Sequence, residues 1–264
     1  MAPPPARPAP APSRTGLFAG VASVVALLVV AAIAIGVIFV GANVLKRTTR
    51  TAGPVEASTS LTSTSGKAVF SDDFRNSSSG WTTTALPSGT TFQYAAEGYV
   101  VVARGTLDHF AASPYSTPVA QIAISVTATQ SADAPVGAGY GVSCWRGTDT
   151  SELRYDFVMT SAGDWTIDRR DGGVLTKPLI LKQGTSKATL GGDPLAIEGM
   201  CVALADEHSV RLVMFAGKAK IADITDSANA LPDAGWQADL MLTSSEIHAS
   251  IVTVMHFEIR DLQR

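Results

Sequence analysis

The residues of this chain best suited to acid–base chemistry are carboxylates on an alternating stretch after residue 150. Glu152 and Asp156 share one face of a predicted strand but stand four residues apart, about 13 Å in a regular strand. Glycoside hydrolysis requires two carboxylates about 5 to 9.5 Å apart across a sugar. Because Arg154 lies between them, the pattern favours a row of compensating surface charges. No catalytic residue is therefore predicted.

Three aspartates are the candidates for metal binding. Asp72, Asp73 and Asp261 lie on or beside the first and last predicted strands, and oxygen ligands of this kind suit calcium. Acids in such places also cap turns and strand edges, so both interpretations stay open. The four histidines show no ligand spacing, and the sequence predicts no cofactor.

Aromatic side chains are the candidates for ligand binding. Rings exposed on a concave sheet could stack on sugar rings, although packing in the core is the alternative for most of them. The candidates are Trp81, Tyr99, Tyr140, Trp145, Trp165 and Trp236.

The two cysteines of the chain, Cys144 and Cys201, each fall on a predicted strand. An isolated pair in an exported domain predicts one disulfide. In a cytoplasmic domain the same residues would be buried thiols. Two cysteines without nearby histidines cannot complete a tetrahedral zinc site.

The strands that must position these residues begin after residue 66, and three segments of different composition precede them. Residues 1–15 form a Pro/Ala-rich tail that we expect to be disordered and cytoplasmic. Residues 16–45 contain no charged side chain and exceed the roughly 20 apolar residues that a membrane helix needs. A cleaved signal peptide has an apolar region of only about 7 to 15 residues. Residues 46–66 are a Ser/Thr-rich linker.

Charge places the rest of the chain relative to the predicted bilayer. Basic residues flank both ends of 16–45, so the linker and the cysteine pair decide the orientation, with the C-terminal domain outside the cytoplasm. The first 50 residues hold five basic and no acidic side chains, which leaves a net charge of −8 downstream. This balance excludes nucleic acid as a partner. The predicted partner is the lipid bilayer, through residues 16–45.

From residue 67 onward the apolar residues recur with a period of two, which predicts strands. Leu153, Tyr155, Phe157 and Met159 are apolar while the residues between them are mostly charged. Gly163 and the pair Gly172–Gly173 mark turns on either side of the next strand. Further strands are predicted at 67–73, 98–103, 119–128, 138–145, 174–181, 195–204, 209–215, 218–224, 236–243 and 249–260. So many strands with short turns imply two packed sheets.

These landmarks resemble a bacterial concanavalin A-like lectin/glucanase domain, a jelly roll often tethered behind a transmembrane helix. The resemblance covers residues 67–264. It rests on the opening VFSDDF and the GW that follows, on EGY at 97–99, GVSC at 141–144, YDF at 155–157, GDWTI at 163–167, Cys201 and the closing HFEI at 256–259. It implies that the last strand pairs with the first. The Glu-x-Asp-x-x-Glu cluster of glucanases with this fold is absent from the sequence.

Together these observations predict an all-β jelly-roll or β-sandwich ectodomain behind a single transmembrane helix. The expected function is a membrane-anchored, extracytoplasmic binding or sensory module for a glycan or another cell-envelope component. Two alternatives remain. One is a glycoside-cleaving enzyme of the same structural class, and the other is a protein-interaction or structural domain without a small ligand.

Overall fold

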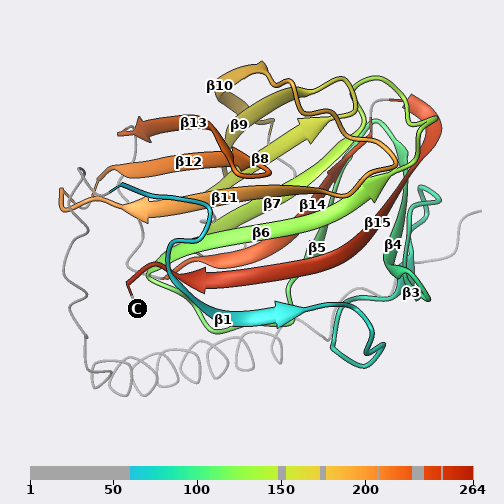
Figure 1. Ribbon diagram of the computed structural model, residues 1–264, viewed down its shortest axis with the longest axis horizontal. Helices are drawn as coiled ribbons and strands as arrows, with labels where there is room; N and C mark the ends of the chain where they lie inside the picture. Colours follow the sequence, from blue (N-terminus) through green and yellow to red (C-terminus); the bar gives the residue numbers. More distant parts are fainter. Residues whose placement is uncertain are drawn as a thin grey trace, which may run out of the picture. The chain divides into compact units, whose positions relative to one another are not determined.

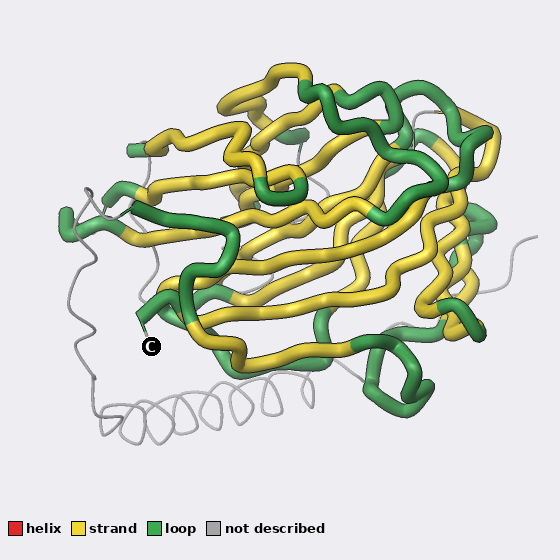
Figure 2. Tube along the Cα trace, in the orientation of Figure 1, coloured by secondary structure: helices red, strands yellow, loops and turns green. Residues whose placement is uncertain are grey.

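The computed structural model describes residues 60–147, 153–172, 177–206, 208–227, 235–244 and 246–263. Within these ranges the chain consists of strands and loops (Figure 2). The strands form two antiparallel sheets that pack face to face (Figure 1). The predicted all-β, two-sheet sandwich is thus confirmed for the described part of the chain.

The larger sheet, sheet A, contains nine strands among the described residues. In order across the sheet they are β13 (Ala219–Asp226), β12 (Val210–Ala216), β11 (Leu195–Ala203), β6 (Gln121–Gln130), β15 (Glu246–Asp261), β4 (Gly98–Gly105), β3 (Thr91–Ala95) and β2 (Thr84–Ala85), with β1 (Lys67–Asp72) paired to β15. The smaller sheet, sheet B, contains six strands in the same described ranges. Their order is β10 (Leu179–Thr185), β9 (Asp164–Asp171), β8 (Leu153–Thr160), β7 (Gly139–Arg146), β14 (Gln237–Thr243) and β5 (Asp108–Ala112).

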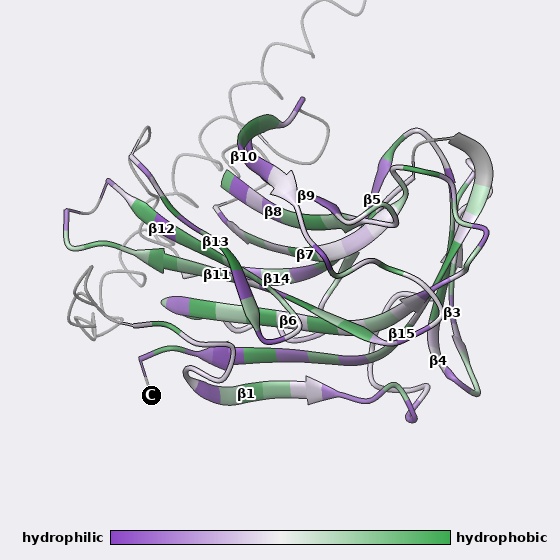
Figure 3. Ribbon diagram, turned by 45° about the horizontal axis from the view of Figure 1, so that its top comes forward, coloured by the Kyte–Doolittle hydropathy of each residue, from purple (hydrophilic) through white to green (hydrophobic). Residues whose placement is uncertain are grey.

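The core lies between the two sheets because alternate residues of each strand point inward. On β8 the inward residues are Leu153, Tyr155, Phe157 and Met159, all of them buried in the main apolar cluster. The same alternation of hydrophobic and hydrophilic residues is visible along β15 (Figure 3). The period-two pattern therefore identified the buried face of these strands correctly.

The two sheets are joined covalently. Cys144 on β7 of sheet B and Cys201 on β11 of sheet A form a disulfide, with their Cα atoms 6.6 Å apart. The predicted disulfide is confirmed. In the chain-entropy model, closing a loop of 57 residues stabilises the fold by about 4 kcal/mol.

The first and last strands pair, as the resemblance implied. β1 runs antiparallel to β15, from Lys67 opposite Asp261 to Asp72 opposite Phe257. The two strands lie side by side in Figure 1, in cyan and red. The N-terminal end of the described domain is thereby fixed to its C-terminal end.

A second, smaller apolar cluster lies on the outer face of sheet A. This sheet A cluster consists of Leu61, Ala123, Met200, Val202, Val213 and Phe215, with Leu262 packed against it. Leu61 belongs to the segment 60–66, which precedes β1. The Arg260 guanidinium donates a hydrogen bond of 2.8 Å to the carbonyl oxygen of Ser65. The last residues of the predicted linker thus pack against the sandwich.

Glycines form the turns that the sequence predicted. Gly163 between β8 and β9 has a φ of 85°, and Gly217 between β12 and β13 has a φ of 59°. Both values lie in the left-handed region that glycine adopts without steric cost. The chain therefore reverses at these two points to give adjacent antiparallel strands.

Some strand predictions were wrong in position or missing. Of the strand predicted at 174–181, residues 174–176 lie outside the described residues, and the described strand runs from Leu179 to Thr185, with a bulge between Ile180 and Lys182. The strands β2, β3 and β5 were not predicted. They are two to five residues long, too short for a period-two pattern to stand out.

The predicted membrane helix at 16–45 and the tail at 1–15 lie outside the described residues. Of the residues that are described, none belong to a helix long and apolar enough to cross a bilayer.

Candidate functional site

Five of the six aromatic residues proposed as ligand contacts lie in the core. None of the five is more than 6% exposed, so their rings are not available to stack on a ligand. This burial corrects the predicted stacking platform for Trp81, Tyr99, Tyr140, Trp165 and Trp236. Large aromatic rings bury much apolar surface, so in a sandwich of this size they pack between the two sheets.

Several of these buried rings also satisfy their polar atoms inside the fold. The Trp81 indole donates a hydrogen bond of 2.9 Å to Asp72. The Tyr140 hydroxyl lies 2.8 Å from the carbonyl oxygens of both Ala128 and Leu195, which ties sheet B to sheet A. Their polar groups therefore have structural partners.

The three calcium candidates do not assemble a site. Asp72, Asp73 and Asp261 each accept the backbone N–H two residues further along the chain. Asp261 lies opposite Lys67, at the other end of β1 from Asp72, roughly 17 Å away along the strand. The described residues contain no group of three or more side chains placed to hold a metal ion. Of the two interpretations left open for these acids, the described contacts fit capping of turns.

The sixth aromatic residue, Trp145, lies elsewhere. It is half-buried and alternates on β7 with the inward residues Val142 and Cys144, so it belongs to the outer face of sheet B. Its indole donates a hydrogen bond of 3.1 Å to Asp239 on β14. Trp145 is the one proposed ligand residue among the six whose position leaves it available.

The outer face of sheet B is concave. Arg170 on β9 forms an ion pair with Asp108 on β5, although β8, β7 and β14 lie between these strands. Four strand spacings amount to roughly 19 Å in a flat sheet, beyond the reach of these two side chains. The sheet must therefore curve so that its two sides approach each other over this face.

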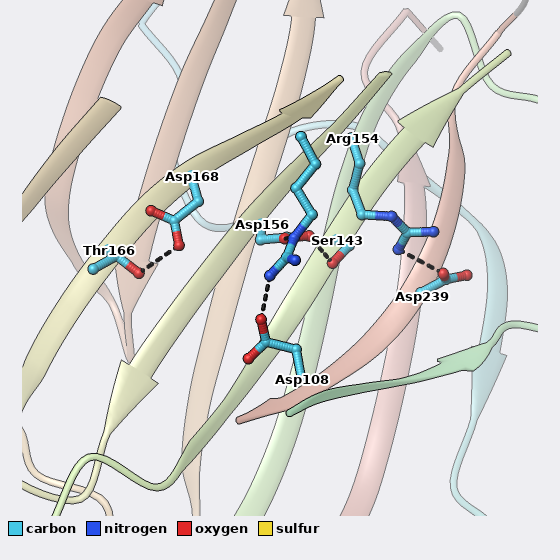
Figure 4. Close-up of polar contacts among 8 residues, drawn as sticks. Asp108, Ser143, Arg154, Asp156, Thr166, Asp168 and Asp239 are labelled. Carbon is cyan, nitrogen blue, oxygen red and sulfur yellow. Dashed lines mark hydrogen bonds and ion pairs between the residues drawn. The ribbon is translucent and has the colours of Figure 1, made fainter. Parts of the chain in front are cut away.

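A network of charged and hydroxyl side chains covers this concave face (Figure 4). We call it the sheet B network: Asp108, Ser143, Arg154, Asp156, Thr166, Asp168, Arg170 and Asp239. Strand register explains how it forms. Asp168, Asp156, Ser143 and Asp239 are successive cross-strand partners on β9, β8, β7 and β14. The strand register thus places these four polar residues in one continuous row across sheet B.

Arg170 and Ser143 hold the buried carboxylate of Asp156. The Arg170 Nε atom lies 2.7 Å from one carboxylate oxygen of Asp156, and the Ser143 hydroxyl lies 2.5 Å from the other. Asp156 is 0% exposed and Arg170 is 4% exposed. Both carboxylate oxygens are therefore occupied and out of contact with solvent.

Arg154 forms the second buried ion pair of the network. Its guanidinium donates to Asp239 at 2.7 Å and lies 4.4 Å from the centre of the Phe110 ring and 5.7 Å from that of Trp145. Such cation–π contacts strengthen when they are desolvated. The two aromatic rings of this face are thus fixed against a charged group.

Burial changes the titration of the carboxylates in the row. It raises the pKa of Asp156, while Arg154, Ser143 and Arg170 act in the opposite direction. Burial, reinforced by the neighbouring charge of Asp156, raises the pKa of Asp168 to about 6. Asp168 therefore differs from an ordinary aspartate near neutral pH.

Asp168 also differs in its hydrogen bonds. The Thr166 hydroxyl donates to its Oδ2 atom at 3.2 Å, as Figure 4 shows. Its Oδ1 atom is buried and has no hydrogen-bond partner among the described residues. The cross-strand neighbour of Asp168 on β10 is Ile180, which is 53% exposed. An unused acceptor thus lies beside an exposed apolar side chain.

Only part of this site could be recognised from the sequence. Arg154 and Asp156 were interpreted as surface charges, and that interpretation is corrected, because both are buried. Opposite charges two residues apart also occur at Asp168 and Arg170. The repetition of this pattern on two adjacent strands could have indicated a charged face shared by both strands. The curvature that buries the charges depends on pairing between distant strands and has no local signature.

Comparison with known proteins finds similar solved structures but no family. No family model and no curated protein matches this chain. Similar solved structures include carbohydrate binding module CBM66 from Bacillus subtilis, with 12% identity over 69% of this chain and 96% of that chain and a TM-score of 0.47. The metal-free carbohydrate recognition domain of Emp46p has 9% identity over 72% and 91%, with a TM-score of 0.44. A native glycosidic hydrolase has 9% identity over 73% and 95%, with a TM-score of 0.49. At these identities and scores the similarity carries no argument about ligand or activity.

Proposed function

We propose that this protein is a non-catalytic binding module for a glycan or another cell-envelope component, and that the concave face of sheet B binds the ligand. The observation that carries the proposal is the sheet B network itself. Arginine and aspartate side chains from β5, β8, β9 and β14 converge there. The Phe110 and Trp145 rings contact Arg154, and one acceptor, Asp168 Oδ1, is left unused.

The chemistry of this face suits a polyhydroxylated ligand. Sugars present hydroxyl donors together with apolar ring faces, and binding sites combine apolar surfaces with a few well-placed polar groups. Here Trp145 and Ile180 supply partly exposed apolar surface. The ion pairs hold the polar groups in fixed positions, which lowers the entropy lost on binding.

Binding is a better fit to this geometry than hydrolysis. A glycosidase needs one carboxylic acid and one carboxylate that both reach the substrate. Asp156 is fully buried and already bound to Arg170 and Ser143. The neighbouring pair Asp156 and Asp168 is therefore not arranged to act on a sugar.

The proposal includes anchoring of the domain outside the cytoplasm by residues 16–45. The disulfide between Cys144 and Cys201 supports an oxidising compartment. A protease added to intact cells should remove the domain, whereas a cytosolic reporter should stay protected. Protection of the domain until the cells are lysed would contradict the proposed orientation.

Glycan binding is tested with the full-length chain in detergent on a glycan array and on purified cell-wall polysaccharide. We expect retention on at least one polysaccharide and a loss of affinity of about tenfold or more in Trp145→Ala, because aromatic contacts dominate many binding sites. Ile251→Ala is the matched control, since Ile251 is an exposed apolar residue on sheet A. The proposal fails if no polysaccharide is retained, or if the two variants behave alike.

A protein-interaction role has one specific observation in its favour. Leu179 and Ile180 are both more than half exposed on β10, which is the last strand on its side of sheet B. Exposed edge strands can pair with another chain. Capture of a protein partner that is lost in Leu179→Lys but kept in Trp145→Ala would favour this role over glycan binding.

A further inference from the structure

The carboxylates of the sheet B network differ in whether a cation accompanies them. Asp239 pairs with Arg154, and Asp156 and Asp108 both pair with Arg170. Asp168 forms no ion pair with any of the described residues. One acidic side chain of the network therefore has no partner of opposite charge in hydrogen-bonding contact.

The network also carries an excess of negative charge. It contains two arginines and four aspartates, a net charge of −2 when all are ionised. Charges on a concave, partly desolvated face act more strongly than charges in water. Such a face repels acidic ligands and attracts a ligand that carries a positive charge.

Asp168 is the carboxylate of the network that such a charge would compensate, through a buried oxygen that has no hydrogen-bond partner among the described residues. Asp168 is 8% exposed, and its Oδ1 atom has no partner among the described side chains. Its pKa is raised by burial and by the charge of Asp156, as expected for a carboxylate without a cation. The neighbouring side chains, Thr166 and Ile180, add a hydroxyl group and an exposed apolar surface.

We propose that Asp168 forms a subsite for a protonated amine of the ligand, so that sugars with a free amino group bind better than their N-acetylated counterparts. The inference rests on the proposed glycan-binding function and narrows its ligand class. An ammonium group supplies both the missing donor and the missing charge. Charge-assisted hydrogen bonds are roughly twice as strong as neutral ones.

The test compares three hexasaccharides, of glucosamine, N-acetylglucosamine and galacturonic acid, by calorimetry with the full-length chain at about pH 6.5, near the pKa of Asp168. We expect glucosamine to bind about tenfold tighter than N-acetylglucosamine, and galacturonic acid to bind most weakly. In Asp168→Asn the preference for glucosamine over N-acetylglucosamine should fall to within about threefold. Asp223→Asn, which removes the same charge from sheet A, should keep the full preference.

The outcomes separate this inference from the proposed function. Equal binding of the amino and N-acetylated sugars, or a preference that survives in Asp168→Asn, overturns the amine subsite and leaves glycan binding intact. Absence of binding to any of the three oligosaccharides overturns the subsite, and the wider polysaccharide screen then decides the function. Thermal unfolding of each variant shows that a lost preference does not come from a lost fold.

Discussion

Different kinds of side chain cover the outer face of sheet A and the outer face of sheet B. On sheet A, apolar residues of β6, β11 and β12 are covered by Leu61 from the segment 60–66. On sheet B, buried arginines and aspartates pair with one another, and the Phe110 and Trp145 rings contact Arg154. Burial of apolar surface stabilises a fold directly, whereas buried ion pairs often add little net stability. The sheet A cluster thus serves stability, and the sheet B network serves position and charge.

The comparison is tested most strongly at Arg170. In Arg170→Met, Asp156 and Asp108 lose their cation, and removal of one partner of a buried pair costs about 3 to 5 kcal/mol. Urea unfolding measures the loss. The matched control is Arg211→Met, which breaks the more exposed pair with Asp223 on sheet A and should cost at most about 1 kcal/mol. Similar losses in the two variants would show that the sheet B network is not desolvated.

The apolar side of the comparison is tested at Leu61. Leu61→Ala should lower the free energy of unfolding by about 2 kcal/mol, at the low end for a buried leucine because the segment can settle onto the cluster. Leu86→Ala is the control, since Leu86 is exposed. A loss below about 0.5 kcal/mol at Leu61 would mean that the segment 60–66 does not pack on sheet A in solution.

The contributions of the two faces to stability should change with pH in opposite directions. Asp168 has a pKa of about 6 in the folded chain, above the unfolded value near 3.9. Its contribution to stability is therefore fully present below about pH 4 and is lost as the pH rises through 6. Asp168→Asn should match the parent at about pH 4 and exceed it by on the order of 2 kcal/mol at about pH 8. Urea unfolding at the two pH values checks this, and equal stability at both would contradict it.

Asp223 on sheet A should behave in the opposite way. The hydrogen bond from Arg211 is the largest influence on its pKa and lowers it to about 2. Its contribution is present above the unfolded value near 3.9 and is lost as the pH falls through 2. Because this pair is partly exposed, Asp223→Asn should cost less than about 1 kcal/mol at neutral pH. The difference should shrink in acid, and a gain in stability at neutral pH would be the contrary result.

The sequence predicted the parts of the fold that depend on local alternation. The inward residues of β8 and the turn at Gly163 were identified in this way, because each depends on residue type and spacing along one strand or turn. The pair Cys144–Cys201 followed from the presence of only two cysteines in the sequence. The same reasoning missed β3 and β5, which are only five residues long.

The candidate site depended on features that spacing does not encode. Arg154 and Asp156 were placed on the correct face of their strand, but the curvature that brings β5 toward β9 and buries them arises from long-range pairing. The aromatic residues failed as indicators for a related reason. A large ring can pack in the core or lie on the surface. Only the sheet register determines that Trp145 lies outside while Trp236 lies inside.

The segment 60–66 also determines how the domain responds to force. A pull on the chain ahead of residue 60 first reaches Leu61 and the hydrogen bond between Ser65 and Arg260, before it loads β1. Detachment of these few contacts would lengthen the chain while both sheets and the disulfide stay intact. Under force the segment 60–66 would therefore detach before the sandwich unfolds. The lifetime of its contacts would be set by their own rate of opening rather than by the unfolding rate of the sandwich.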